Sequence, residues 1–249
     1  MSFKEKVIII TGAASGIGKA TAKMFHAKGA SLVLGDVNWQ GLESVVQELT
    51  GGAPIFSRSV DVGDPSACHE FVAAAVAEYG KLDVLCNVAG ILDWSPLSNF
   101  DSTRWDRIVA VNLRSVFFLS QAAMPYLIAT KGNIVNISSS AALVGIAYNS
   151  AYCATKAGVV AMTKSMAIEF AADGVRINAI CPSAVNTPLI THAKFPEGAD
   201  MALIMRNAVK LGRYIEPEEI AAAIAYLASE DGRSISGIAF PVDGAQTAG

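Results

Sequence analysis

A tyrosine and a lysine in the second half of the chain have the spacing of a proton-exchanging pair. Tyr152 and Lys156 lie four positions apart, so on a helix they share one face. A free tyrosine has a pKa of about 10 and is a poor base at neutral pH. A neighbouring ammonium group favours the phenolate and lowers that pKa, so the pair could exchange protons with a substrate near pH 7. Ordinary surface helices often carry the same spacing, and the interpretation therefore depends on its context.

Three glycines near the N-terminus form a second chemical signal. They follow an apolar run at residues 7–10 that is typical of a buried strand. Gly12, Gly16 and Gly18 then open a segment with helical character. Such a turn leaves backbone N–H groups and the positive end of the helix dipole facing outward, where they can bind a pyrophosphate. The spacing differs from the commoner Gly-x-Gly-x-x-Gly, and a purely structural turn could look similar.

An aspartate after the second apolar run strengthens the dinucleotide interpretation. Asp36 lies 18 positions after Gly18, where an acidic side chain meets the adenosine ribose in dinucleotide-binding folds. Its carboxylate would accept hydrogen bonds from both ribose hydroxyls and repel a 2′-phosphate. Ala13, Ala14 and Val37 supply no cation for that phosphate. We therefore expect NAD rather than NADP as the cofactor, and a loop aspartate that begins a turn is the alternative.

The rest of the chain alternates apolar, β-branched runs with longer helical segments. This alternation predicts an α/β fold: a Rossmann-type, doubly wound parallel sheet of about seven strands with helices on both faces. The expected strands span residues 7–10, 31–34, 55–59, 84–87, 133–138, 176–181 and 238–242. No linker or repeat interrupts the pattern, so residues 1–249 are expected to form a single dinucleotide-binding and catalytic domain.

Composition narrows the class of protein. The 249 residues are 52% hydrophobic and 16% charged, with a net charge of -3 and no Lys/Arg cluster, which argues against nucleic-acid and anionic-membrane partners. Four scattered cysteines are expected to be reduced thiols, and no ligand spacing suggests a metal. Without a signal-peptide pattern at the N-terminus, the expected location is cytoplasmic.

Two expected helices, at about 103–128 and 150–172, are apolar around most of their circumference. A surface helix usually carries a single apolar stripe. The pattern indicates a second subunit as burial partner, in a homodimer or homotetramer, and deep burial within one subunit is the alternative.

Several further motifs, in the expected order, make the chain resemble the short-chain dehydrogenase/reductase family nearly end to end. Asp61 and Val62 match the pair that contacts adenine in that family. Residues 87–90 match its Asn-Asn-Ala-Gly motif, with Val88 in place of the second asparagine. Residues 182–187 match its Pro-Gly segment and the threonine that meets the nicotinamide carboxamide, with Ser183 in place of the glycine.

The resemblance implies a reaction and a role for single side chains. Ser139 lies 13 positions before Tyr152, as the catalytic serine of the family does, and would hold the substrate oxygen; Ser138 and Ser140 are the competing choices. Lys156 would also bind the nicotinamide ribose. Tyr152 would take the proton from a substrate hydroxyl while hydride passes to nicotinamide, and would return it in reduction.

The remaining residues of the expected site follow from the same resemblance. Asn112 would be the fourth catalytic residue and would hold an ordered water that extends the proton path. The expected cofactor site comprises Gly12, Ser15, Gly16, Ile17, Gly18, Asp36, Asp61, Val62, Asn87, Ala89, Gly90, Tyr152, Lys156, Pro182, Val185 and Thr187.

Substrate contacts are expected beyond the carboxyl ends of the strands, where ligands bind such sheets. A largely apolar helical lid at about residues 188–212 favours a neutral or hydrophobic substrate. The expected pocket residues are Trp94, Ser140, Tyr148, Leu189 and His192. The sequence thus predicts an NAD-dependent enzyme that interconverts a secondary alcohol and a ketone. A 3-oxoacyl-thioester reductase and a non-catalytic NAD-binding scaffold or sensor are the alternatives.

Overall fold

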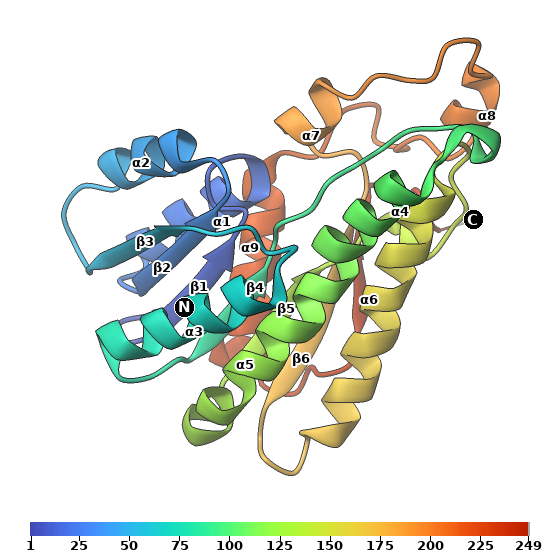
Figure 1. Cartoon of the computed structure of the whole chain (residues 1–249). Coiled ribbons are helices and arrows are strands. Elements are labelled where there is room, and N and C mark those ends of the chain that lie inside the picture. Colours follow the sequence, from blue (N-terminus) through green and yellow to red (C-terminus); the bar gives the residue numbers. More distant parts are fainter. Residues whose placement is uncertain (249) are drawn as a thin grey trace.

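A parallel sheet forms the centre of the molecule in the computed structural model, which describes residues 1–248 (Figure 1). Its seven strands are hydrogen-bonded in the order β3-β2-β1-β4-β5-β6-β7, and every neighbouring pair is parallel. The strands are β1 (Val7–Thr11), β2 (Ser31–Asp36), β3 (Ile55–Ser59), β4 (Val84–Asn87), β5 (Asn133–Ile137), β6 (Arg176–Pro182) and β7 (Ala239–Val242). The predicted fold class and all seven predicted strands are confirmed.

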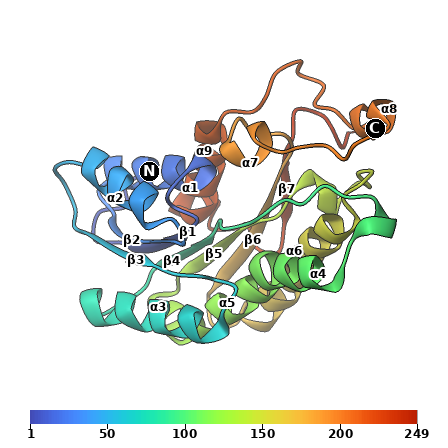
Figure 2. The same cartoon turned by 45° about the horizontal axis from the view of Figure 1, so that its top comes forward.

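Helices cover both faces of this sheet. They are α1 (Gly16–Ala27), α2 (Trp39–Glu48), α3 (Pro65–Tyr79), α4 (Ser102–Val109), α5 (Ser115–Thr130), α6 (Ser150–Glu169), α7 (Pro188–Thr191), α8 (Met201–Met205) and α9 (Pro217–Ala228). Figure 2 shows α1, α2 and α9 on one face and α3, α5 and α6 on the other. Side chains alternate along a strand, so Ile8 and Ile10 pack with the first group of helices while Val7 and Ile9 pack with the second.

The long apolar helix expected at about 103–128 is divided into α4, a π-helical turn at Ala110–Arg114, and α5. The whole stretch Ser102–Thr130 is long and apolar enough to cross a membrane, yet 56% of its most apolar window is buried inside this fold, as in the core helix of a globular protein. Some apolar side chains nevertheless reach the surface. Phe117 on α5 is 46% exposed and Ile168 on α6 is 81% exposed.

The segment at 188–212 carries two short helices, α7 and α8, joined by irregular chain. Pro196 and Gly198 lie between them, and Gly198 has a left-handed φ of +70°. Asp200 then begins α8, because its carboxylate accepts hydrogen bonds from the backbone N–H groups of Ala202 at 2.8 Å and Leu203 at 3.4 Å.

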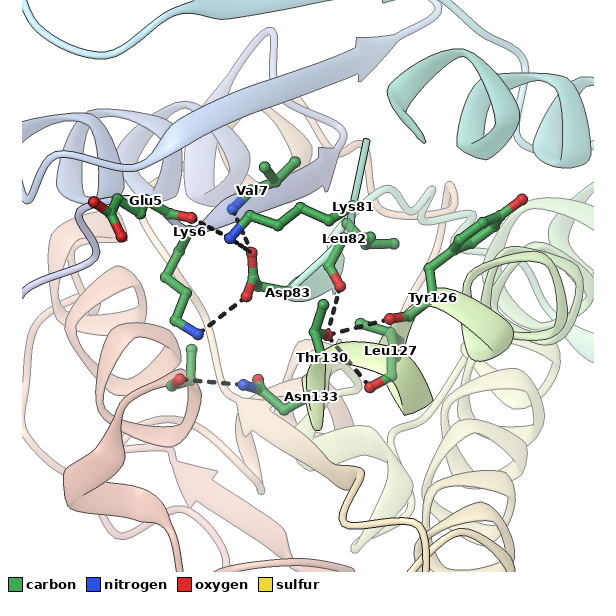
Figure 3. Close-up of polar contacts among 11 residues, drawn as sticks. Glu5, Lys6, Val7, Lys81, Leu82, Asp83, Tyr126, Leu127, Thr130 and Asn133 are labelled. Atoms are coloured by element: carbon green, nitrogen blue, oxygen red, sulfur yellow. Dashed lines mark hydrogen bonds and ion pairs between the residues drawn. The ribbon is translucent and has the colours of Figure 1, made fainter. Parts of the chain in front are cut away.

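A buried carboxylate joins the strands at the amino-terminal edge of the sheet (Figure 3). Asp83 is 4% exposed, and its Oδ1 accepts from Lys6 Nζ at 3.0 Å. Its Oδ2 accepts from Val7 N at 2.9 Å and lies 3.1 Å from Lys81 Nζ. The backbone of Asp83 also donates to Val7 O and accepts from Asn133 N, both at 3.0 Å. One residue thus holds β1, β4 and β5 in register, and the opposite ends of these strands carry the site described below.

We expect Asp83→Asn to lower the free energy of unfolding by about 1–3 kcal/mol, because an amide cannot serve two ammonium groups and a buried backbone N–H at once. Both lysines are partly exposed, which keeps the loss below that of a fully buried pair. Urea unfolding at neutral pH measures it. Arg58→Gln, which breaks an exposed ion pair of 3.0 Å with Glu70, is the matched control and should have a smaller effect. Equal losses in the two variants would contradict the role of Asp83.

Candidate active site

A cavity of about 270 Å³ opens at the carboxyl ends of the central strands, between β1 and β4, where the order in which the chain adds strands to the sheet reverses. Such switch points form a crevice between the loops that leave the two strands on opposite sides. The predicted cofactor residues that line it are Gly12, Ser15, Gly16, Ile17, Gly18, Asp36, Asp61, Val62, Ala89, Gly90, Tyr152, Lys156, Pro182, Val185 and Thr187. The structure therefore gathers most of that set, from six separate segments, around one space.

The glycine turn lies on this cavity at the start of α1. Gly12 has a left-handed φ of +68°, and a Cβ there would lie 2.9 Å from Ala89 Cα. A Cβ on Gly18 would collide with the Gly12 carbonyl oxygen. Both positions need glycine, so the backbone of α1 approaches closely and presents its first N–H groups to the cavity. The side chain of Ser15, at the N-cap, accepts from none of these N–H groups in α1, which leaves them available for a pyrophosphate.

The acidic residue at the end of β2 is held in place by backbone donors. Asp36 Oδ2 accepts from Ala14 N at 3.0 Å, and its Oδ1 accepts from Asn38 N at 2.8 Å. Val37, beside it, is 65% exposed. The carboxylate therefore lies next to the glycine turn with a fixed orientation at the edge of the cavity, which suits it to accept from ribose hydroxyls.

The end of the cavity near Asp61 contains an ion pair that the sequence analysis missed. Asp61 Oδ1 accepts from Gly63 N at 2.9 Å, and Arg107 Nη1 donates to both carboxylate oxygens at 3.2 and 3.0 Å. Partial burial raises the pKa of Asp61, but the hydrogen bonds from Gly63 and Arg107 prevail and hold that pKa below its usual value. Arg107 lies on α4, five positions before Asn112. No motif in the sequence indicated that its side chain would reach the loop after β3.

The end of the cavity that holds the expected catalytic residues is formed by the start of α6 and the segment after β5. Lys156 is 3% exposed, its Nζ donates to Ile137 O at 2.9 Å, and the same Nζ lies 5.7 Å from the centroid of the Tyr152 ring. Ser138 and Ser139 both line the cavity with Tyr152. Ser138 Oγ donates to the Lys156 carbonyl at 2.8 Å, so its hydroxyl proton is engaged in joining β5 to α6.

The three neighbouring serines thus have different environments. Ser139 Oγ accepts from Ala141 N at 3.1 Å, and its contact with Pro182 O is long, at 3.5 Å. Its hydroxyl also lies close enough to Tyr152 to favour the phenolate by hydrogen bonding. Ser140 is 2% exposed and lies outside the lining of the cavity. The arrangement favours Ser139 as the hydroxyl that can contact a substrate.

Burial decides the acid–base properties of the pair on α6. It raises the pKa of Tyr152 to about 12, although the Ser139 hydroxyl opposes this by hydrogen bonding. It lowers the pKa of Lys156 to about 8. The direction for Tyr152 is opposite to the expected lowering, because loss of hydration disfavours the phenolate more than the protein's own groups stabilise it. Within the chain itself, Tyr152 therefore keeps its proton at neutral pH.

Asn112 lies behind these groups in the π-helical turn, a deformation that is frequent at functional sites. Its side chain is fully buried, and its Nδ2 donates to Ile91 O at 2.9 Å while its Oδ1 accepts from Ile91 N at 2.8 Å. A Cβ on Gly90 would lie 3.4 Å from Asn112 Oδ1 and 3.5 Å from Lys156 Nζ. The side chains of Asn112 and Lys156 thus both approach Gly90, and the amide of Asn112 holds the loop after β4.

Asn87 lies outside the cavity lining. It is 3% exposed, and its Nδ2 donates to Asn136 Oδ1 at 2.8 Å, while Asn136 Nδ2 donates to Thr163 Oγ1 at 2.9 Å. This chain of side-chain hydrogen bonds joins β4, β5 and α6 beneath the site. Thr11, which the sequence did not single out, accepts from Ala89 N at 3.2 Å and joins the glycine turn to the loop after β4.

The predicted substrate residues do not all share one surface. Leu189 lines the cavity, together with Ile190, which belongs to the expected lid but not to the expected set of pocket residues. Trp94 packs edge-to-face on Phe195, with ring centroids 5.0 Å apart. Tyr148 lines a second cavity of about 280 Å³ beside α4. His192 follows α7 and is exposed. Among residues 1–248, His, Cys, Asp and Glu side chains form no group that could hold a metal ion.

Known proteins share both the sequence and this architecture. A family model described as "Enoyl-(Acyl carrier protein) reductase" matches residues 12–247. The chain is 39% identical over 246 residues to 3-oxoacyl-(acyl-carrier-protein) reductase of Thermotoga maritima, with 98% of each chain covered. It is 39% identical over 248 residues to meso-2,3-butanediol dehydrogenase of Serratia marcescens, with 100% of this chain and 97% of the other covered.

A solved structure gives the same result. The 3-ketoacyl-(acyl-carrier-protein) reductase of Brucella melitensis, crystallised with NADH, aligns with a TM-score of 0.90 at 32% identity, over 99% of this chain and 100% of that chain. The matched regions include both the glycine turn and the Tyr152–Lys156 pair. The structural match extends over the whole sheet. The chain belongs to the short-chain dehydrogenase/reductase family of oxidoreductases.

Proposed function

We propose that this protein is an NAD(H)-dependent dehydrogenase that interconverts a secondary alcohol and a ketone on a neutral or hydrophobic small molecule. The observation that carries the proposal is that Ser139, Tyr152 and Lys156 line the same cavity as the glycine turn and Asp36. A bound nicotinamide dinucleotide supplies the hydride acceptor or donor. The relative from Serratia marcescens acts, by its name, on a secondary alcohol.

The protein's own side chains supply position and protons. The Ser139 hydroxyl donates to the substrate oxygen and fixes its angle. In reduction the Tyr152 phenol gives its proton to that oxygen, and in oxidation the phenolate takes it back. The buried amine of Lys156, with a pKa lowered to about 8, can accept and release protons near neutral pH and lies between Tyr152 and Asn112. We therefore assign Lys156 and Asn112 to the proton path away from the phenol.

The preference for NAD over NADP rests on Asp36. Its two hydrogen bonds from backbone N–H groups prevent the carboxylate from turning away from a 2′-phosphate. The cations that line the cavity, within residues 1–248, are Arg107 and Lys156. Arg107 is paired with Asp61, and Lys156 lies at the catalytic end. A 2′-phosphate at Asp36 would therefore meet repulsion without a compensating cation.

A 3-oxoacyl-thioester reductase is the second candidate, since that activity is in the name of the relative from Thermotoga maritima. The apolar Leu189 and Ile190 on the lid side of the cavity suit a small hydrophobic substrate instead. A scaffold without turnover would have no use for a serine, a phenol and an amine converging beside the cofactor groove. Parallel assays with secondary alcohols and with a 3-oxoacyl thioester separate these activities.

We also propose a homodimer or homotetramer, located in the cytoplasm. The exposed apolar side chains of Phe117 and Ile168 on α5 and α6 would be covered by another subunit. All four cysteines are free thiols, as expected in a reducing compartment. Sedimentation of the purified protein determines the subunit count.

Replacing the phenol tests the proton-transfer role directly. We expect Tyr152→Phe to lower kcat by about 10²-fold or more, because the substrate oxygen loses its proton donor. The Kd of NADH should stay within about twofold, since the ring remains in the cavity wall. Steady-state assays with a panel of secondary alcohols and NAD⁺, and NADH titration, give both values. Tyr214→Phe, at a tyrosine that is 51% exposed, is the control. Full turnover in the Tyr152 variant would refute the assignment.

Cofactor preference tests the role of Asp36. We expect NADH to bind at least about tenfold more tightly than NADPH, because repulsion across roughly 5 Å amounts to about 1–3 kcal/mol. Asp36→Ala should reduce the ratio of the Kd of NADPH to the Kd of NADH. Asp173→Ala, at an exposed acid after α6, should leave this ratio unchanged. Thermal shift with each cofactor reports the binding. Equal or greater stabilisation of the wild type by NADPH would show that Asp36 does not select the cofactor.

The lowered pKa of Lys156 predicts a pH dependence of stability. Between pH 8 and pH 10.5 the unfolded chain holds the Lys156 proton while the folded chain releases it, so this group's contribution to stability rises with pH in that window. Below pH 8 both states are protonated, and the penalty for burying the charge is complete. The unfolding free energy of the wild type should therefore gain about 2–3 kcal/mol relative to Lys156→Met between pH 7 and pH 10. Urea unfolding at both pH values measures this difference, and a pH-independent difference would contradict it.

A further inference from the structure

The loop that follows β4 is clamped by one arginine from α4. Arg104 Nε donates to Asp93 Oδ2 at 2.7 Å, and its Nη2 pairs with Asp93 Oδ1. Its Nη1 donates to Ser95 Oγ and to Asn99 O, both at 3.2 Å. The guanidinium also lies 4.7 Å above the centroid of the Phe100 ring. All three nitrogens of its fork thus hold residues of a single loop, which a lysine cannot reproduce.

Trp94 lies between the two side chains that Arg104 clamps. Its ring packs edge-to-face on Phe195 of the segment at 188–212, with centroids 5.0 Å apart and an interplanar angle of 76°. The buried indole Nε1 has no hydrogen-bond partner among residues 1–248. The orientation of Trp94 therefore depends on packing and on the backbone that Asp93 and Ser95 fix.

A second contact joins the same loop to the same segment. Ser95 N donates to Tyr148 O at 2.9 Å, and the Tyr148 hydroxyl accepts from Asp200 N at 3.0 Å. Asp200 begins α8. The outer part of the segment at 188–212 thus rests on two aromatic side chains, Trp94 and Tyr148, and Arg104 fixes the loop to which both are joined.

The inner part of that segment forms a wall of the catalytic cavity. Leu189 and Ile190, on α7, line it together with Ser139 and Tyr152. Phe195 lies five positions after Ile190. A shift of the Trp94–Phe195 contact would therefore move the apolar wall relative to the reacting groups. Arg104 itself is absent from the residues that line this cavity.

We propose that Arg104 is a positioning residue for the substrate side of the site. It holds Trp94 through Asp93 and Ser95, and so fixes the segment that carries Leu189 and Ile190. It would determine the KM for the alcohol or ketone without contacting substrate or cofactor. The kinetic part rests on the proposed dehydrogenase function, and the structural part stands without it.

Tryptophan fluorescence tests the structural part. The chain has three tryptophans, and Trp39 and Trp105 are 42% and 45% exposed. In a Trp39→Phe/Trp105→Phe background, the emission comes from Trp94 alone. We expect Arg104→Gln to shift this emission to longer wavelength and to raise acrylamide quenching by about twofold, with a smaller change for Arg104→Lys. Asp93→Asn should change both in the same direction. Unchanged emission and quenching in Arg104→Gln and Asp93→Asn would overturn the proposal.

Kinetics with the same variants test the consequence for substrate. We expect Arg104→Gln to raise the substrate KM about fivefold or more, with kcat and the Kd of NADH each within about twofold, and Arg104→Lys to restore part of the KM. Arg58→Gln, which breaks an exposed arginine–glutamate pair between β3 and α3, should change none of these values. An unchanged KM, or an equal rise in the Kd of NADH, would overturn the positioning role. Absence of turnover in the wild type would count against the proposed function, and the fluorescence result would still decide the clamp.

Discussion

The burial of one ammonium group organises the part of the cavity formed by α6 and the end of β5. Lys156 is 3% exposed, and its Nζ is held by the carbonyl at the end of β5. This contact fixes the position of α6 along the sheet. It therefore also positions Tyr152, which lies one turn earlier on the same helix. The cost of removing the charge from water appears as the lowered pKa of Lys156. The same dry environment raises the pKa of Tyr152, so position and protonation state have one common cause.

The sheet can accommodate the buried Lys156 because the two ends of its strands have different roles. At the amino-terminal edge, Asp83 gathers two lysines and the backbone of β1. At the carboxyl edge, the strands end in polar loops that face the cavity. A parallel sheet places all its carboxyl ends on one side, so residues distant in sequence, such as Gly12, Asp61 and Ser139, come to line one space. The contacts of Asp83 at the amino ends of the strands therefore support the placement of the cavity-lining residues at the carboxyl ends.

Local patterns in the sequence were sufficient for the strands and the cofactor groove. The runs predicted at 55–59 and 84–87 coincide with β3 and β4. The glycine turn was predictable because Gly12 and Gly18 have no room for a Cβ. The raised pKa of Tyr152 could not be predicted from the sequence, since desolvation depends on everything that packs around the ring. Arg107 and Arg104 were also missed, because a long cationic side chain on a helix can reach several loops and the sequence does not say which one.

Although α4 is short, these two arginines connect it to two separate loops. They lie three positions apart, on one face of the helix. Arg107 reaches Asp61 after β3, at the cavity. Arg104 reaches Asp93 after β4. The π-helical turn then directs Asn112 to Ile91 of that second loop. One continuous helical stretch thus holds the loops after β3 and β4, so a change in the pitch of α4 would move both loops together.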